Sequence, residues 1–149
     1  MNNGEVRFER DLAKLATYLG CIYEKVPDVI ITKSNIIKRN GKSFVAAKKR
    51  FADGVLITPK AVFILECKYN DGQLKPHQKQ SMNRINQINE SYYILRKRAK
   101  VKDFKTIVTY YIQNIVNNRV TTQYKTESLK DIILWFKEKN NEDRKKKGN

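Results

Sequence analysis

The sequence is poor in the residues that most often build disulfide or zinc sites. It contains two cysteines, Cys21 and Cys67, and one histidine, His77. Two distant cysteines without CxxC spacing exclude a disulfide framework and argue against structural zinc. A single histidine excludes chemistry that needs a histidine pair. We expect Cys67 to be a small buried side chain and His77 to lie on the surface, in the first turn of a helix.

Long apolar runs are also missing. No segment has the length and apolar character of a membrane span, and the N-terminus lacks the charged and then apolar order of a secretory signal. No lipidation motif is present. We therefore expect an intracellular, cytoplasmic protein without a membrane partner, and the small size suits a protein encoded by a phage or a mobile element.

Acidic residues are scarce. The chain has 15 Asp and Glu against 31 Lys and Arg, which gives a net charge of +16. Its 149 residues are 40% apolar, which favours one folded domain over a disordered basic chain. We expect that domain over residues 1–140, with a disordered basic tail over residues 141–149. A basic surface attracts phosphate, so nucleic acid is the expected partner.

One stretch organises the chain. Residues 51–68 contain two apolar, partly β-branched runs on either side of Pro59 and Lys60, the pattern of a β-hairpin. If the turn is centred between Pro59 and Lys60, counting outward places Asp53 directly opposite Glu66. Residues paired in this way project their side chains from one face of the sheet. The register therefore predicts a carboxylate pair.

Sheet stability does not explain this pair, because two facing carboxylates repel and each resists ionising beside the other. The two-residue period of a strand puts Lys68 on the same face as Glu66. A divalent cation would remove the conflict between Asp53 and Glu66, and oxygen ligands suit Mg²⁺ or Mn²⁺. The alternative is an ordinary hairpin with a surface salt bridge between Glu66 and Lys68.

Two amphipathic helices flank this hairpin in the sequence. The first is expected over residues 4–19, with Gly20 as its C-terminal stop. Glu9 borders its buried stripe. It either reaches toward a metal centre or is a solvent-side acid paired with a neighbouring Arg or Lys.

The second helix starts at Lys75-Pro76, and its expected buried face is made by three apolar residues. Gln78 lies on the same stripe, four residues before the first of them, and close to the end of the strand that carries Glu66. A buried amide needs hydrogen-bond partners, which a lysine, a phosphate or a water would supply. The three apolar residues are Met82, Ile85 and Ile88.

Basic residues gather in two places. Asn40-Gly41 between two β-prone runs predicts a tight hairpin over residues 36–45, and it is surrounded by cations. We interpret it as a nucleic-acid clamp, the alternative being a solvated cationic hairpin. The second place is a basic connector after a strand over residues 92–95. The residues expected to contact nucleic acid are Lys38, Arg39, Lys42, Lys48, Lys49, Arg50, Arg96 and Arg98.

Further elements are expected along the chain. Short strands are predicted over residues 29–31, 106–112 and 120–124. A last helix over residues 127–139 is apolar over more than a narrow stripe, so it is either well buried or partly an interface.

The order of these motifs is similar to that of a known superfamily. A helix with Glu9, a strand with Asp53, the run Glu66-Cys67-Lys68 and a helix with Gln78 resemble the PD-(D/E)XK nucleases, most closely the stand-alone VRR-NUC domains and the Holliday-junction resolvases. The resemblance covers roughly residues 5–98. Ala52 stands where the superfamily name has proline, and residues 100–149 have no counterpart.

The resemblance implies both a fold and a set of roles. The fold is α/β, a restriction-endonuclease-like αβββαβ core with a mixed central sheet flanked by helices, here followed by C-terminal β-strands and a helix. Asp53 and Glu66 would hold Mg²⁺, or Mn²⁺ in its place, with the backbone carbonyl of Cys67. Lys68 would activate or position the attacking water. Gln78 would orient that lysine or the scissile phosphate, and Glu9 would support the metal through water.

The leading hypothesis is therefore a Mg²⁺-dependent endonuclease that hydrolyses phosphodiester bonds of DNA at Holliday or other branched junctions. Such an enzyme serves DNA recombination and repair, and we expect it to act as a homodimer because a junction offers two equivalent strands. Two alternatives stay open: a sequence-specific, restriction-like endonuclease, and a non-catalytic basic nucleic-acid-binding protein. The choice of DNA over RNA and the number of metal ions also stay open.

Overall fold

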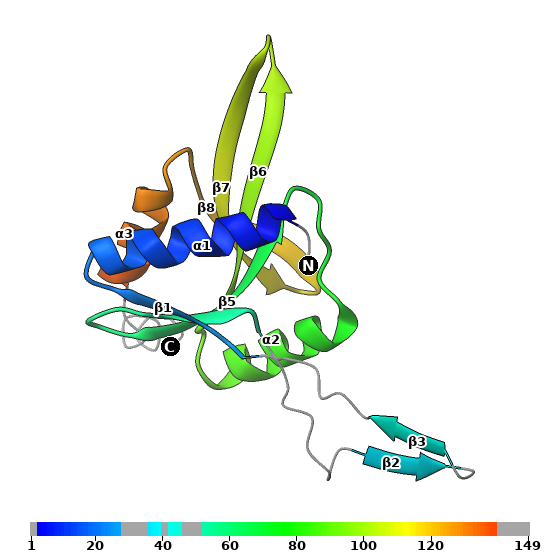
Figure 1. Ribbon diagram of the computed structural model, residues 1–149. Helices are drawn as coiled ribbons and strands as arrows, with labels where there is room; N and C mark the ends of the chain where they lie inside the picture. The colour runs from blue at the N-terminus through cyan, green and yellow to red at the C-terminus, as the bar shows by residue number, and fades with distance from the viewer. Residues whose placement is uncertain (1–2, 28–35, 40–41, 46–51, 140–149) are drawn as a thin grey trace.

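The computed structural model describes residues 3–27, 36–39, 42–45 and 52–139, and the side chains of all these except 36–39 and 42–45 (Figure 1). Six strands form one mixed sheet in the order β1-β4-β5-β6-β7-β8, and β2 and β3 form a separate pair. The elements are α1 (Asn3–Tyr18), β1 (Ile22–Lys25), β2 (Ile36–Arg39), β3 (Lys42–Val45), β4 (Gly54–Ile57), β5 (Val62–Tyr69), α2 (Pro76–Ile88), β6 (Tyr92–Lys102), β7 (Lys105–Val116), β8 (Arg119–Thr126) and α3 (Leu129–Glu138).

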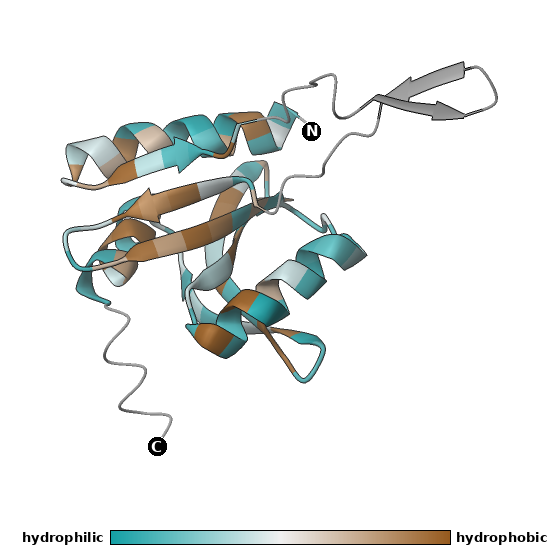
Figure 2. Ribbon diagram, turned by 90° about the horizontal axis from the view of Figure 1, so that it is seen from below, coloured by the Kyte–Doolittle hydropathy of each residue, from teal (hydrophilic) through white to brown (hydrophobic). Residues whose placement is uncertain are grey.

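Helices cover both faces of the six-stranded sheet. The helices α1 and α3 pack on one face, where Phe8 and Phe136 join a large apolar cluster with the inward side chains of the strands. The helix α2 packs on the other face through a smaller cluster around Met82 and Tyr92. Figure 2 shows the apolar strands between these helical layers. The chain is thus an α/β protein with a mixed sheet flanked by helices, as expected.

The central hairpin has the predicted register. Gly54 of β4 pairs with Leu65 of β5, and the same count continued by one residue sets Asp53 opposite Glu66. The turn closes where it was expected, because the amide of Thr58 donates to the carbonyl of Ala61 at 2.9 Å. The paired acids therefore stand at the open end of the hairpin, where β4 begins.

The strand registers also decide which side chains share a face. Strand β5 runs parallel to β6, with Lys68 paired to Arg96, and β6 runs antiparallel to β7, with Arg96 paired to Tyr111. Because paired residues project to the same side, Glu66 and Lys68 lie on the α2 face. Cys67, between them, projects to the α1 face and is fully buried there, which confirms its expected role as a small core residue.

The basic connector expected after residue 95 is wrong. Strand β6 continues to Lys102 and pairs with β7 without a register shift as far as Lys105. Four basic residues, Arg96, Arg98, Lys100 and Lys102, occupy every second position of this strand, which is the two-residue period of side chains on one face. The strand expected over residues 106–112 is likewise longer, and β6 and β7 form a hairpin that extends away from the body (Figure 1).

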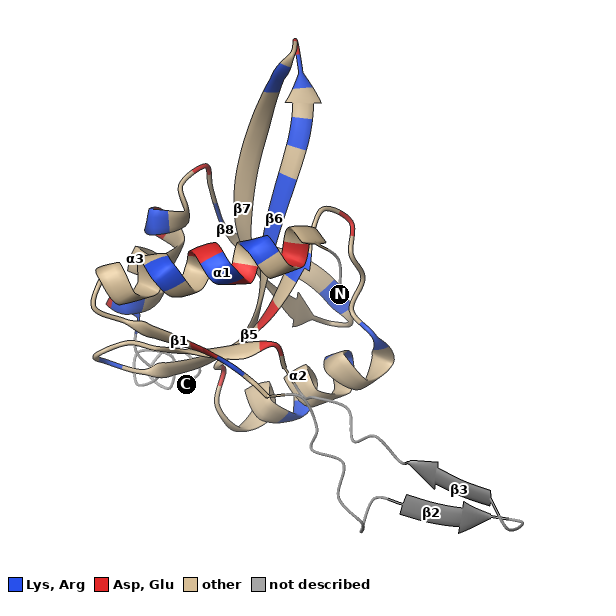
Figure 3. Ribbon diagram, viewed as in Figure 1, with Lys and Arg blue, Asp and Glu red and all other residues tan. Residues whose placement is uncertain are grey.

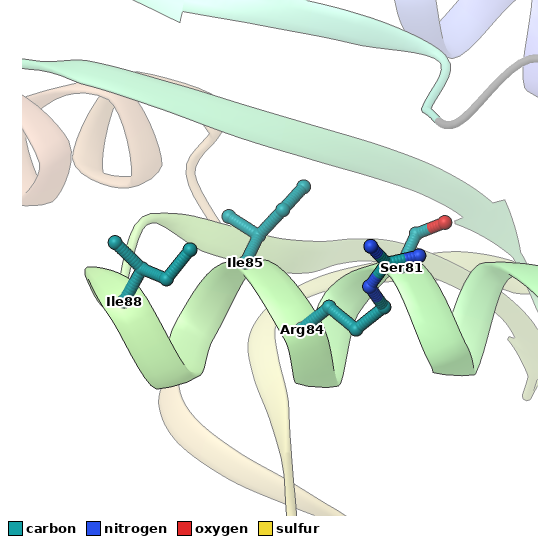
Figure 4. Close-up of a pocket in the computed structure, with 4 residues that line it drawn as sticks. All are labelled: Ser81, Arg84, Ile85 and Ile88. Carbon is teal, nitrogen blue, oxygen red and sulfur yellow. The ribbon is translucent and has the colours of Figure 1, made fainter.

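The expected buried face of the second helix is correct except at its end. Met82 is fully buried and Ile85 packs against the same cluster, but Ile88 is 86% exposed. The helix ends at Ile88, so its last turn passes the edge of the core. Ser81, Arg84, Ile85 and Ile88 line a shallow pocket on that side (Figure 4).

Further expectations concern the β2–β3 hairpin, one short strand, the C-terminal tail and membrane spans. The antiparallel pairing expected within residues 36–45 is confirmed in the backbone of β2 and β3, where Arg39 pairs with Lys42, and Asn40-Gly41 lies outside the described residues. The strand expected over residues 29–31 and the tail over residues 141–149 lie outside the described residues. Among the helices of the described part, none is long and apolar enough to cross a membrane.

We predict that Gly54→Ala destabilises the fold by about 1–3 kcal/mol, because overpacking a filled site carries that cost. A Cβ at position 54 would overlap the ring and hydroxyl of Tyr23. Urea unfolding of purified variants measures the loss. Gly72→Ala is the control, since its Cβ would meet its nearest atom, the Tyr69 carbonyl oxygen, at 3.4 Å. Equal stability of the two variants would contradict the packing of Tyr23 over β4.

Candidate metal and catalytic site

Asp53 is fixed to the edge of β5. Its Oδ2 accepts a hydrogen bond from the backbone amide of Cys67 at 2.8 Å, beyond the point where β4 pairs with β5. In a strand the amide and carbonyl of one residue point to the same edge, so the carbonyl of Cys67 also faces the Asp53 side. The expected metal ligands Asp53 and Cys67 are therefore adjacent at this edge.

Glu66 is the most deeply buried acid of the site; two side chains donate hydrogen bonds to it and a third forms an ion pair with it. Gln78 Nε2 donates to Glu66 Oε1 at 2.6 Å, and Lys68 Nζ lies 3.6 Å from the same oxygen. The Tyr92 hydroxyl donates to Oε2 at 3.4 Å. The predicted group of Glu66, Lys68 and Gln78 is thus assembled on the α2 face.

Gln78 owes its position to the start of α2. Its Oε1 accepts a hydrogen bond from the backbone amide of Lys75 at 2.8 Å, so the side chain both caps the helix and reaches the site. With the carbonyl end of the amide held by the backbone, the NH₂ end is aimed at Glu66. The glutamine is therefore fixed in orientation before any ligand binds.

Glu9 is buried, so the alternative of a solvent-side acid is wrong. Its Oε1 accepts a hydrogen bond from the Tyr23 hydroxyl at 2.7 Å, and its Oε2 lies 3.9 Å from Lys25 Nζ. The Tyr23 hydroxyl also lies 3.7 Å from Cys67 Sγ. Ligand atoms of Glu9, Asp53 and Cys67 all lie within 4.8 Å of one another.

Asp53 therefore joins two groups of side chains. On the α1 side stand Glu9 and the Cys67 thiol, and on the α2 side stand Glu66 and Lys68. The four charged residues are between 1% and 8% exposed, so solvent screens their charges little. The expected constellation is one continuous site that crosses the end of β5.

Negative charge is in excess in this site. Burial, and then the neighbouring Asp53 carboxylate, raises the pKa of Glu66 to about 8, although Lys68 opposes the shift. Burial, and then Asp53 and Glu9, raises the pKa of the Cys67 thiol well above its ordinary value. Among the described residues, three carboxylates thus have the buried Lys68 and the half-exposed Lys25 as nearby cations.

This charge balance fits a bound divalent cation, which would stabilise the ionised carboxylates. Glu9, Asp53, Glu66 and the Cys67 carbonyl offer oxygen atoms, the ligands that Mg²⁺ and Mn²⁺ prefer. The Cys67 thiol is a poor ligand for these ions, because it is soft and its raised pKa keeps it protonated. The oxygen set is therefore the better candidate for holding the ion.

The expected nucleic-acid contacts divide into three groups. Arg96 differs from the expectation: it is buried, its Nη1 donates to the carbonyls of Asn70 and Gly72, and its Nε donates to Gln113, so it holds the turn between β5 and α2. Arg98 is exposed and pairs with Asp71 at 3.1 Å. The side chains of Lys38, Arg39 and Lys42, and all of Lys48, Lys49 and Arg50, lie outside what the structure describes.

Two tyrosines of the site were missed from the sequence. Tyr23 lies on β1, a strand of four residues whose sequence, Ile-Tyr-Glu-Lys, is too short to show a clear period. Tyr92 was assigned to a strand but given no role at Glu66. Burial raises the pKa of both phenols, so both stay protonated and donate to carboxylates.

The comparisons with known proteins add no identification. No protein-family model matches the sequence, and no curated protein matches it either.

We predict that the metal-free protein loses stability as pH rises from 4.5 to about 8. The unfolded chain releases the Glu66 proton near 4.5 while the folded chain retains it, so the unfolded state binds fewer protons in this window. Thermal melts in EDTA across this range measure the fall.

Glu66→Gln is the control, because glutamine has nearly the shape of glutamate and carries no titratable proton. This variant should show a flatter pH profile, because residue 66 no longer titrates. Identical profiles for the two proteins would contradict a protonated Glu66.

We predict that Cys67→Ser leaves Mn²⁺ affinity within about threefold of the unchanged protein, because hard cations take oxygen ligands here. Isothermal titration with Mn²⁺ measures the affinity, and Asp53→Asn is the comparison that should lose it. A large loss in Cys67→Ser with none in Asp53→Asn would instead indicate a thiolate site for a softer metal.

Proposed function

We propose that the chain is a Mg²⁺-dependent endonuclease that hydrolyses phosphodiester bonds of branched DNA. The observation that carries the proposal is the buried cluster in which Asp53 and Glu66, on adjoining strands, meet Lys68 and Gln78. Two carboxylates and a primary amine in one buried place match the needs of phosphodiester hydrolysis better than those of sheet stability.

Each residue of the cluster has a role in this proposal. Asp53, Glu66 and the Cys67 carbonyl would hold a divalent cation, with Glu9 supporting it. Such a cation would neutralise charge that develops on the phosphate and lower the pKa of a nearby water. Lys68 would donate to a phosphate oxygen or to the attacking water, since its ammonium is a compact charge with three donors.

Gln78 and Arg96 act at a distance from the reacting atoms. Gln78 holds Glu66 at 2.6 Å and would keep its carboxylate turned toward the cation. Arg96 ties the β5–α2 turn through the carbonyls of Asn70 and Gly72, and this turn connects Lys68 to Gln78. Both are positioning residues in this proposal.

The order of elements also supports it. From α1 through β1, β4, β5 and α2 to β6, the chain runs helix, three antiparallel strands, helix and a parallel strand. This is the αβββαβ order that the resemblance to PD-(D/E)XK nucleases implies, with β2 and β3 as an insertion. Glu9 lies on α1, Glu66 and Lys68 lie on β5 and Gln78 lies on α2, and Asp53 directly precedes β4.

We predict that Asp53→Asn and Glu66→Gln each abolish cleavage of a labelled four-way junction while changing DNA binding by less than about threefold, because they remove metal ligands and not phosphate contacts. Cleavage is measured with Mg²⁺ and with EDTA, beside a linear duplex of matched sequence. The matched control is Glu138→Gln, an acid whose side chain is 79% exposed, and it should cleave normally.

Each outcome separates the candidate functions. Metal-dependent cutting confined to the junction supports the proposal, and cutting of the linear duplex at one short sequence favours a restriction-like enzyme. Tight binding to both DNAs without cutting in Mg²⁺ or Mn²⁺ favours a non-catalytic binding protein. Unchanged cleavage in Asp53→Asn would overturn the assigned site. Paired cuts on opposite strands would further require two copies of the chain on one junction.

A further inference from the structure

The hairpin made by β6 and β7 forms an arm that is not needed to complete the core. The outer part of the arm extends beyond the helices that cover the sheet (Figure 1). At its base Tyr110 packs against Phe8 of α1, with ring centres 5.8 Å apart, whereas Val101, Phe104 and Ile107 are exposed toward the tip. The arm is therefore open to solvent toward its tip.

One face of the arm is cationic. Arg98, Lys100 and Lys102 alternate along β6, about 6.8 Å apart, and so project to the same side. The register adds Lys105 opposite Lys102, and β8 adds Lys125 opposite Tyr111. Figure 3 shows this row of basic residues along β6. This face of the arm carries Arg98, Lys100, Lys102 and Lys105, and Asp103 is the one acid among residues 97–111, so the face suits a polyanion.

The cationic face continues to the candidate site. Arg98 follows Arg96 by two residues on the same side of β6, and Arg96 is paired with Lys68. An open groove of about 470 Å³ lies on this face, with Asp71 of the β5–α2 turn and Arg98, Lys102 and Tyr111 of β6 and β7 among its lining residues. Both Arg98 and Lys125 lie 5.7 Å from the centre of the Tyr111 ring, a cation–π distance that orders the two cations.

The tip of the arm is strained and hydrophobic. Its two-residue turn, Asp103-Phe104, has φ values of 52° and 63°. The next hairpin makes the same turn with Asn117 and Asn118, which tolerate the left-handed region. A phenylalanine there is disfavoured, and Phe104 is fully exposed, so it gains no packing in return.

We infer that this arm is the nucleic-acid-binding surface of the chain, with the lysine row on the phosphates and Phe104 as a wedge that stacks on an unstacked base at a branch. The inference rests on the proposed function for the class of ligand. Phosphate contacts from a basic strand and an apolar side chain between bases are complementary parts of nucleic-acid recognition. Branched DNA offers both a phosphate backbone and exposed base faces.

The lysine row is tested by binding in EDTA, where cleavage is not needed. Lys100→Gln, Lys102→Gln and Lys105→Gln together should weaken binding to a four-way junction at least tenfold and lower the slope of log affinity against log salt by about 2–3, roughly 0.9 for each phosphate that is no longer neutralised. The matched control removes three exposed lysines of α1, the β4–β5 turn and α3. These are Lys14, Lys60 and Lys130.

The wedge is tested with Phe104→Asn. Asparagine suits the left-handed turn, so the variant should melt at the same temperature as the unchanged protein or higher. It should bind the junction about tenfold more weakly, because the aromatic ring no longer stacks on a base. A 2-aminopurine base at the branch should brighten when the unchanged protein binds, and not when the variant binds.

The results distinguish this inference from the proposed function. Equal binding by the two triple variants overturns the lysine row, and an unchanged 2-aminopurine signal in Phe104→Asn overturns the wedge. Absence of any nucleic-acid binding by the unchanged protein overturns both. Binding that depends on the arm, with no cleavage under any metal, supports the arm and removes the nuclease.

Discussion

The hydrogen bond from the Cys67 amide to Asp53 is the contact on which the site depends. It occupies the position where a ladder bond between β4 and β5 would otherwise continue, and a carboxylate takes the place of a backbone carbonyl. The antiparallel pairing therefore ends in a charged side chain and not in another strand residue. That exchange opens the edge of β5 and brings Asp53 between Glu66 on one side and Glu9 on the other.

Burial of so many acids is unfavourable for the fold alone, and the surrounding structure compensates for it only in part. Tyr23, Tyr92 and Gln78 supply neutral donors, while Lys68 supplies charge. Neutral donors satisfy oxygen atoms without cancelling their charge, so the repulsion between the carboxylates persists. Among the described residues, the cluster thus has its hydrogen bonds while repulsion between its acids remains, and a bound cation would relieve that repulsion.

The parts of the site that follow from local rules could be read from the sequence. The Asp53–Glu66 register followed from a symmetric turn, and the place of Gln78 from helical spacing. The link between Glu9 and Tyr23 could not be predicted, because it joins α1 to a strand too short to show a pattern. The burial of Arg96 depends on two carbonyls of the β5–α2 turn and on the amide of Gln113 in β7, which are distant from it in the sequence. The alternation of residues along β6 indicated its full length, but its many basic residues led to the prediction of a connector after residue 95.

Strand β6 belongs to both the core and the arm, and its pairing with β7 has no register shift from Ile94 to Lys102. A ladder without a bulge has no point at which to bend sharply, so the arm has no hinge of its own. From Arg96 to Lys102 the strand spans roughly 20 Å at about 3.4 Å per residue. A group that contacts the tip of the arm is therefore held at a fixed distance from Lys68, and the length of β6 sets that distance.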